Sequence, residues 1–118
     1  MYAPDSGYAD EEYTDFLDIL RHKMNEATRS ADLLIMGDFN AKVGEDQLLN
    51  WPGAAGRFGL GQVNHRGQML LQFCAINDLV ICNTLFNHKE TRRVTWVSPD
   101  GTTKNQIDYI MIERKRRR

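Results

Sequence analysis

A short apolar run that ends in Gly-Asp-Phe-Asn constrains the fold of this chain more than any other stretch. Leu33–Met36 are four consecutive apolar residues bounded by polar ones, which is the pattern of a strand buried on both faces. Gly37 permits a turn, or a close backbone approach, that a side chain would block. Asp38 and Asn40 therefore stand where the predicted strand meets its loop, and in open α/β sheets ligands bind at that end of a strand.

Asp38 and Asn40 have two interpretations, and both stay open at the level of sequence. Two residues apart on extended chain, their side chains point the same way. A carboxylate beside an amide suits hydrated Mg²⁺ and the oxygens of a phosphate. The purely local alternative is that Asp38 begins an Asx-turn and Asn40 adopts a left-handed backbone. The spacing alone favours the turn, since turn chemistry is common.

The composition indicates one soluble globular domain at most, since the 118 residues are 42% hydrophobic and 26% charged. The net charge of −1 gives no overall attraction to nucleic acid or membrane, so any nucleic-acid contact must be local. No apolar run is long enough to span a membrane, and no signal peptide is recognised. We therefore expect an intracellular protein, nuclear or cytoplasmic and not secreted, with Cys74 and Cys82 as free thiols.

The first predicted helix runs from Asp10 to about Ala27, because Asp10 is a good N-cap and acidic residues follow it in the first turn. Its buried stripe is expected to hold the apolar residues at helical spacing, Tyr13, Phe16, Leu17, Leu20 and Met24. His22 is expected to be solvated rather than catalytic. A buried strand at Ala31–Met36 follows, so the two elements form half of an α/β unit.

A second helix is predicted at His65–Ile76, capped by Asn64 and ended by Asn77 in a left-handed conformation. Its buried side is expected to hold Met69, Leu70, Phe73, Cys74 and Ile76. Another short buried strand, Leu79–Cys82, comes next.

The segment 42–63 is predicted to be a flexible loop that borders an active site or lies along a substrate, because it holds Pro52 and five glycines. Its Gly53–Gly59 portion lacks the Gly-Lys-Ser/Thr of a nucleotide-binding loop. Arg57 and the pair His65-Arg66 could supply local positive charge there or could simply be solvated.

The C-terminal third is predicted to be an antiparallel hairpin of Arg92–Val97 and Gln106–Ile112 around a turn at Ser98–Gly101. Asp108 lies inside the second strand, where a carboxylate is unfavourable unless something pairs with it. It either faces water on an edge or holds a cationic or imidazole partner. The basic tract 114–118 is a weak nucleic-acid signal or a frayed terminus.

Four landmarks in this order resemble the endonuclease/exonuclease/phosphatase superfamily: Tyr2-Ala-Pro, Gly37-Asp-Phe-Asn40, Thr95-Trp96 and Gln106-Ile-Asp108-Tyr. Longer motifs around these landmarks resemble one branch of the superfamily more closely, the endonuclease domain of non-LTR retrotransposon reverse-transcriptase proteins. The motifs that carry this closer resemblance are Gly37-Asp-Phe-Asn-Ala-Lys-Val-Gly44, Asn64-His-Arg-Gly67, Asn83-Thr-Leu-Phe86, Thr95-Trp-Val-Ser-Pro-Asp-Gly101 and Asn105-Gln-Ile-Asp-Tyr109.

The resemblance implies a catalytic role for four residues. Asp38 would position the attacking water and contribute weakly to a metal site, while Asn40 would bind the phosphate oxygens. Tyr2 would hydrogen-bond the phosphate, and Asp108 would orient a catalytic histidine. The residues implied to contact DNA are Trp96, Asn105 and Arg66. The implied cofactor is Mg²⁺, with Mn²⁺ as a substitute, and the implied reaction is phosphodiester hydrolysis of DNA by an activated water.

Two family features are missing from the printed sequence: a metal-binding Glu in a strand before Tyr2, and a catalytic His in a Ser-Asp-His after the strand of Asp108. We therefore expect residues 1–118 to be a partial domain of the α/β (α+β) class. It would be the C-terminal part of a DNase I-like four-layer sandwich, incomplete, inactive when isolated and prone to self-association. The alternatives are a catalytically dead module that binds nucleic acid or protein, and a phosphoesterase of the same superfamily.

Overall fold

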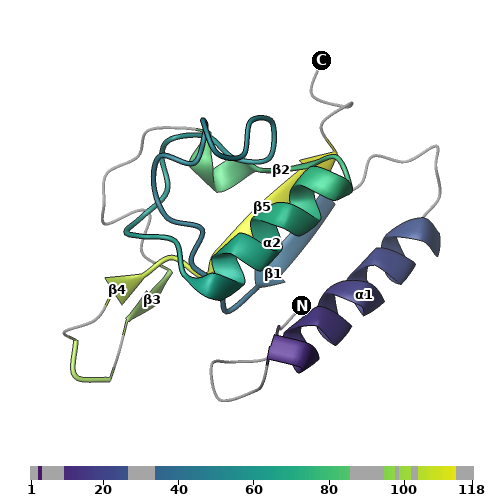
Figure 1. The fold of residues 1–118 in the computed structure, drawn as a ribbon. Coiled ribbons are helices and arrows are strands. Elements are labelled where there is room, and N and C mark those ends of the chain that lie inside the picture. The colour runs from purple at the N-terminus through teal and green to yellow at the C-terminus, as the bar shows by residue number, and fades with distance from the viewer. Residues whose placement is uncertain are drawn as a thin grey trace.

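The computed structural model describes Ala3 and residues 10–26, 34–85, 95–97, 99–101 and 104–113. Its elements in chain order are α1 (Asp10–Glu26), β1 (Leu34–Asp38), α2 (His65–Ile76), β2 (Leu79–Ile81), the 3₁₀ turn η1 (Cys82–Thr84), β3 (Trp96–Val97), β4 (Lys104–Asn105) and β5 (Asp108–Glu113) (Figure 1). Within these ranges the molecule is a three-stranded sheet, a separate two-stranded ribbon and helices packed on the larger sheet.

The three-stranded sheet has the order β1-β5-β2, and both outer strands run antiparallel to β5. Met111 is opposite Ile35 on one side and opposite Ile81 on the other, which fixes the register. The predicted hairpin is therefore wrong in its second strand. β3 pairs with β4, while β5 leaves the ribbon to fill the centre of the sheet.

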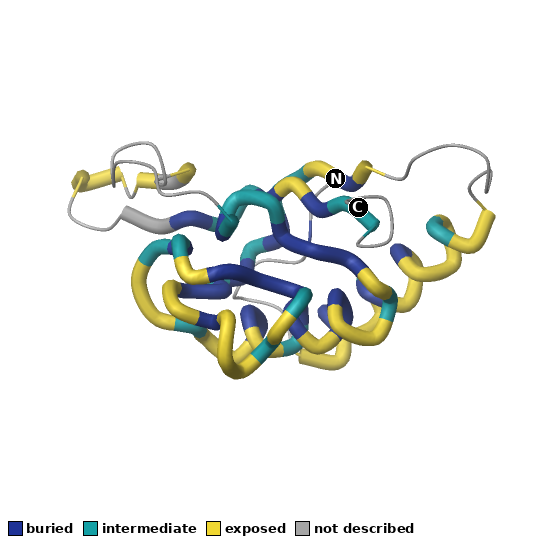
Figure 2. Tube along the Cα trace, turned by 90° about the horizontal axis from the view of Figure 1, so that it is seen from above, coloured by how far each residue is buried: buried dark blue, intermediate teal, exposed yellow. Residues whose placement is uncertain are grey.

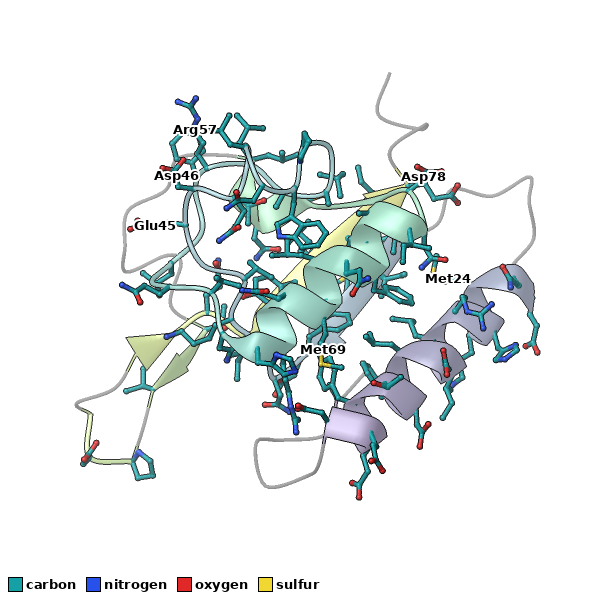
Figure 3. The ribbon with its side chains drawn as sticks, viewed as in Figure 1. Met24, Glu45, Asp46, Arg57, Met69 and Asp78 are labelled. Atoms are coloured by element: carbon teal, nitrogen blue, oxygen red, sulfur yellow. The ribbon has the colours of Figure 1, made fainter. Side chains whose placement is uncertain are left out.

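Both helices lie on the same face of this sheet, with α1 beside α2 (Figures 1 and 2). The stripe predicted for α1 is confirmed: Tyr13, Leu17 and Leu20 are buried, and Phe16 and Met24 pack against the core at its margin. Figure 3 shows Met24 of α1 and Met69 of α2 pointing into the seam between the helices. His22 is exposed, as predicted.

The second helix begins and ends where the sequence predicted, and the Asn64 side chain accepts a hydrogen bond from the Gly67 amide. Two details differ. Ile76 is 71% exposed rather than buried, because it stands at the last position of the helix. The left-handed residue after the helix is Asp78, with φ of 56°, whereas Asn77 has φ of −100°.

The two faces of the sheet differ in burial, so the prediction of a β1 strand buried on both faces is wrong. The face beneath the helices carries Ile35, Ile81 and Met111, all of them in the hydrophobic core. The opposite face, which we call the outer face, carries Leu34, Met36 and Ile110 at 57%, 56% and 39% exposure. Leu34–Met36 therefore alternates in burial, as a strand covered on one side does.

The glycine-rich segment between β1 and α2 is a loop, as predicted, and backbone hydrogen bonds hold it together. Its chain folds back on itself, with Glu45 N–H donating to Gly61 O and Asp46 N–H donating to Arg57 O, each at 2.9 Å. It also docks on the sheet, because the Ile81 amide donates to Ala54 O at 2.8 Å.

Both cysteines are free thiols, as predicted; Cys74 is buried and Cys82 half-buried. Burial raises the pKa of the Cys74 thiol. None of the helices in the described ranges has both the length and the apolar character needed to cross a membrane.

Candidate functional site

Two aspartates are direct cross-strand partners where β1 and β5 meet. Asp38 and Asp108 are cross-strand partners at the end of the ladder. The next bond runs from Phe39 N–H to Ile107 O at 2.9 Å, which makes Asp38 and Asp108 a non-hydrogen-bonded pair. Strand geometry then sets their Cα atoms about 4.5 Å apart, with both side chains on the outer face. Like charges so placed destabilise a sheet, so another role has to account for them.

The local turn role of Asp38 and Asn40 is present in the structure. The Asn40 amide donates to Asp38 Oδ1 at 2.9 Å, and Asn40 has φ of +45°. Both side chains are half-buried. The Asn40 side-chain amide donates to Ala3 O at 2.7 Å, and Ala3 N–H donates to Asp38 O at 2.8 Å. Ala3 is thereby tied to the strand end that carries Asp38.

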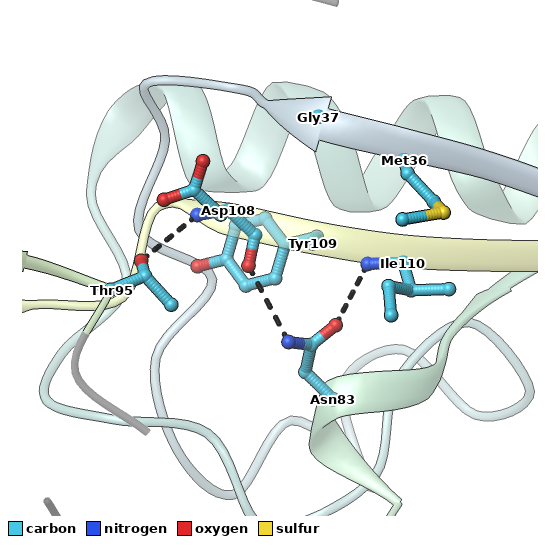
Figure 4. Close-up of a pocket in the computed structure, with 7 residues that line it drawn as sticks. All are labelled: Met36, Gly37, Asn83, Thr95, Asp108, Tyr109 and Ile110. Atoms are coloured by element: carbon cyan, nitrogen blue, oxygen red, sulfur yellow. Dashed lines mark hydrogen bonds between the residues drawn. The ribbon is translucent and has the colours of Figure 1, made fainter. Parts of the chain in front are cut away.

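A cavity of about 370 Å³ opens beside Asp108 on the outer face (Figure 4). Its lining comes from β1, η1, β5 and the residue before β3, namely Met36, Gly37, Asn83, Thr95, Asp108, Tyr109 and Ile110. The cavity therefore joins the β1–β5 strand ends to the loop that carries the Thr-Trp motif.

Two side chains hold the backbone of Asp108 from the side away from β1 (Figure 4). Thr95 Oγ1 accepts from the amides of Ile107 and Asp108 at 2.8 and 3.1 Å. Asn83 Nδ2 donates to Asp108 O at 3.4 Å. Asp108 is thus half-buried at the start of the central strand, which differs from the exposed-edge interpretation.

Tyr109 supports the site from beneath the sheet, a role that sequence reasoning missed. Its hydroxyl donates to Gln106 O at 2.7 Å and accepts from the Val43 amide at 3.1 Å. Burial raises the pKa of this phenol, and the neighbouring Asp108 charge adds to the effect. The alternation of polar and apolar residues around Asp108 is the signal that could have revealed it, since it assigns Tyr109 to the buried face.

The remaining candidate residues are placed unequally. Tyr2 lies outside the described residues. Trp96 and Asn105 are partners in the β3–β4 ribbon, and their side chains lie outside the described part of the structure.

Arg66 does not join the cavity. It is 8% exposed, and its guanidinium lies 5.0 Å from the centre of the Tyr13 ring, with Nε 3.7 Å from Asp10 Oδ1. Through these contacts Arg66 takes part in the packing of α1 on α2. Its role in contacting DNA stays a prediction.

The donor set fits one mode of divalent-metal binding. Within the described ranges no group of three or more His, Cys, Asp and Glu side chains could enclose a metal ion. Asp38 and Asp108 nevertheless offer two hard carboxylates on one face. Mg²⁺ commonly binds through one or two carboxylates and completes its shell with water and substrate phosphate. The site suits that mode and not a closed protein cage.

The described residues form an α/β arrangement: a small antiparallel sheet is covered by helices on one face, and two aspartates are paired at its strand ends. A sequence model of the Endonuclease/Exonuclease/phosphatase family matches residues 2–115, and the chain belongs to this family. Its fold is accordingly of the DNase I-like type, and hydrolases of this type are generally dependent on divalent metals.

Among curated proteins the chain is similar to Craniofacial development protein 2 of Bos taurus, at 45% identity over 116 residues. It is 44% identical to the protein of the same name from Tragulus javanicus, also over 116 residues. Each match covers 98% of this chain but only 19% or 20% of the relative. The chain therefore spans about a fifth of the length of these relatives. No solved structure matches it.

Proposed function

We propose that this chain forms the part of a Mg²⁺-dependent DNA endonuclease that carries its acid pair, and that it derives from a retrotransposon. The observation that carries the proposal is the direct pairing of Asp38 with Asp108 on an open face beside a cavity. Two like charges directly opposite each other destabilise a sheet. Such a pair is understandable where it has to hold a cation or a proton-transferring group.

The chemistry follows from what each residue can hold. When bound at this site, Mg²⁺, or Mn²⁺ as a substitute, would neutralise the charge that develops on the scissile phosphate. The carboxylate of Asp38 would orient the water that attacks phosphorus, because its turn fixes the direction of the side chain. Asp108 would orient a histidine, and the Asn40 amide would lie next to the phosphate oxygens.

Metal binding is tested on the 118-residue chain itself with Mn²⁺ as a paramagnetic probe in NMR spectra. We expect the amide signals of Asp38 and Asp108 to broaden at lower Mn²⁺ concentrations than those of Asp46 and Asp78, two exposed aspartates elsewhere in the fold. Broadening that is no stronger at the acid pair would contradict a metal role for it.

Nicking is tested in a chimera, because the resemblance implies a Glu and a His that these 118 residues do not supply. The chain replaces the matching 116 residues of the Bos taurus relative, and relaxation of supercoiled plasmid is followed with Mg²⁺. The informative variant is Asp38→Asn, because its side-chain oxygen can still accept the Asn40 amide while the charge is lost. We expect it to lower kcat by about a hundredfold or more.

The outcomes separate the competing functions. Nicking that survives both Asp38→Asn and Asp38→Ala would come from another site or a contaminant and would overturn the proposal. DNA binding without nicking in the wild-type chimera would instead favour the catalytically inactive binding module. Hydrolysis of small phosphoesters but not of plasmid would favour the phosphoesterase.

A further inference from the structure

The central strand β5 is longer than the strand that pairs with it on the η1 side. The β2–β5 ladder ends where Ile81 is opposite Met111, and the chain then turns into η1. β5 itself continues back to Asp108. Between Met111 and the start of β5, no strand of the described residues covers this edge, although the edge carries backbone groups that need partners.

The side-chain amide of Asn83 takes the place of the missing strand residue. Its Oδ1 accepts from the Ile110 amide at 2.8 Å, and its Nδ2 donates to Asp108 O at 3.4 Å (Figure 4). A side-chain amide offers the same donor and acceptor as a peptide group. The Asn83 side chain therefore forms hydrogen bonds to β5 just beyond the end of the β2–β5 ladder, where the backbone has already turned into η1.

Asn83 is itself held on a rigid support. The next residue, Thr84, is fully buried; its hydroxyl donates to Ile81 O at 2.7 Å and accepts from the Gly56 amide at 2.9 Å. The Thr84 carbonyl also accepts from the Phe58 amide. The glycine-rich segment therefore holds η1 in place through its hydrogen bonds to Thr84. Asn83, in the same turn, then holds β5 through its own side-chain hydrogen bonds.

We infer that Asn83 is a positioning residue that keeps Asp108 opposite Asp38. The inference rests on the proposed function, in which this acid pair does the chemistry. Asn83 grips the carbonyl of Asp108 and the amide two residues further along. Those two groups set the rotation of the strand about its own axis at Asp108, and that rotation decides whether its carboxylate meets the one on β1. Loss of the amide frees the strand end to twist away.

The first test is structural and independent of activity. In a non-hydrogen-bonded antiparallel pair the two Hα atoms are in contact, so Asp38 and Asp108 should give a strong Hα–Hα NOE, as should Leu34 and Ile112 at the other end of the same ladder. In Asn83→Ala we expect the first cross-peak to be lost and the second to persist. Hydrogen exchange at the Ile110 amide should accelerate by about fivefold or more.

The matched control is Asn77→Ala. Asn77 also donates its side-chain amide to a backbone carbonyl, that of Phe73 at 2.9 Å, but it does so at the end of α2. This variant should keep both cross-peaks. If Asn83→Ala keeps the Asp38–Asp108 cross-peak, or if both variants lose both cross-peaks, the positioning role is overturned.

The second test measures kinetics in the chimera. Asn83→Ala should lower kcat for plasmid nicking by about ten- to a hundredfold with KM unchanged, because a small misplacement of a catalytic group has effects of that size. The kcat of Asn83→Asp should also stay below that of wild type, because the new carboxylate can accept a hydrogen bond from the Ile110 amide but cannot donate one to Asp108 O. Asn77→Ala should match wild type, and an equal fall in kcat for both alanine variants would contradict the inference.

The two tests fail separately. If the wild-type chimera does not nick DNA, the proposed function fails, while the NOE comparison still decides whether Asn83 positions Asp108. If the chimera nicks but Asn83→Ala leaves kcat unchanged, Asn83 is not a positioning residue and the endonuclease proposal stands.

Discussion

The two interpretations of Asp38 and Asn40 turn out to be compatible at the scale of single residues. One oxygen of Asp38 closes the turn by accepting the Asn40 amide, and the strand register places the same residue directly opposite Asp108. A residue that fixes its own turn also fixes the direction of its side chain. Under the proposed function, the local turn would preorganise the acid pair, so the two interpretations do not exclude each other.

The cost of the acid pair can be measured with Asp108→Asn. Removing one of two facing charges should raise the free energy of unfolding at pH 7 by about 0.2–1 kcal/mol, which corresponds to a few degrees in Tm. The gain should shrink at high salt, because exposed charges are screened. Thermal denaturation at low and high ionic strength checks this. Asp18→Asn, on the exposed side of α1, is the control and should change Tm little. A lower Tm for Asp108→Asn would mean that the charge is already paired.

Buried titratable groups should limit stability in alkali. Burial raises the pKa of Tyr13, Cys74 and Tyr109 above their ordinary values. Below about pH 8.5 these groups are neutral in both states, so stability does not depend on them. As the pH rises further the unfolded chain releases their protons first, and each group then removes about 1.4 kcal/mol per pH unit above its ordinary pKa.

Urea denaturation between pH 7.5 and 11 measures this loss. Wild-type stability should begin to fall near pH 8.5, where an unfolded cysteine titrates, and should fall more steeply near pH 10. Cys74→Ala should be less stable throughout but should begin its fall only near pH 10. A stability that stays flat to pH 11 would show that these groups are less buried than the structure places them.

At the scale of elements, the sequence predicted what depends on local pattern and missed what depends on strand partners. The bounds of α2 and the Asn64 cap were correct because cap and periodicity are local signals. The partner of β5 was wrong, because a strong turn at Ser98–Gly101 predicts a hairpin but does not say how far its second strand extends. Similarly, the apolar run of β1 could not show that one face of the sheet is open.

The glycine-rich segment illustrates the same limit. Glycine content predicts flexibility, yet these glycines permit close packing. A Cβ on Gly59 of this segment would lie 1.8 Å from Gly44 O, and a Cβ on Gly67 of the neighbouring helix α2 would lie 1.8 Å from Lys42 O. Such contacts join residues that are far apart in the sequence, so they are invisible until the fold is known.

Gly67→Ala tests this packing at a position where helix propensity and packing predict opposite changes in stability. Within a helix, alanine is normally favoured over glycine by about 1 kcal/mol. Here the new methyl group would meet the Lys42 carbonyl, which accepts a hydrogen bond from the Asn64 backbone amide and cannot move without breaking that bond. Overpacking of about 1–3 kcal/mol or more should therefore outweigh the gain. Gln68→Ala, at the next and exposed position, should be neutral or slightly stabilising in the same urea titration. If Gly67→Ala is stabilising, the close approach of α2 to Lys42 is absent in solution.

At the scale of the whole molecule, the described residues form a core under one face of the sheet only. The helices bury Tyr109 and Met111, whereas the outer face exposes the apolar side chains of Leu34, Met36 and Ile110 beside the acid pair. Contiguous apolar surface of this kind marks an interaction site or a tendency to aggregate. The open face and the strand ends that carry Asp38 and Asp108 are parts of one surface, so whatever covers the first also shapes the approach to the second.

We predict that the 118-residue chain associates with itself through this outer face. Burying one large apolar side chain contributes about 1.5–3 kcal/mol, so Met36→Lys should weaken association by about tenfold or more. Ile76→Lys is the matched control, because Ile76 is 71% exposed but stands at the end of α2, away from the outer face. Sedimentation velocity over a range of protein concentrations should show wild type and Ile76→Lys associating and Met36→Lys remaining smaller. A chain that is monomeric at every concentration, or one that Ile76→Lys disperses equally well, would show that the exposed strands do not drive association.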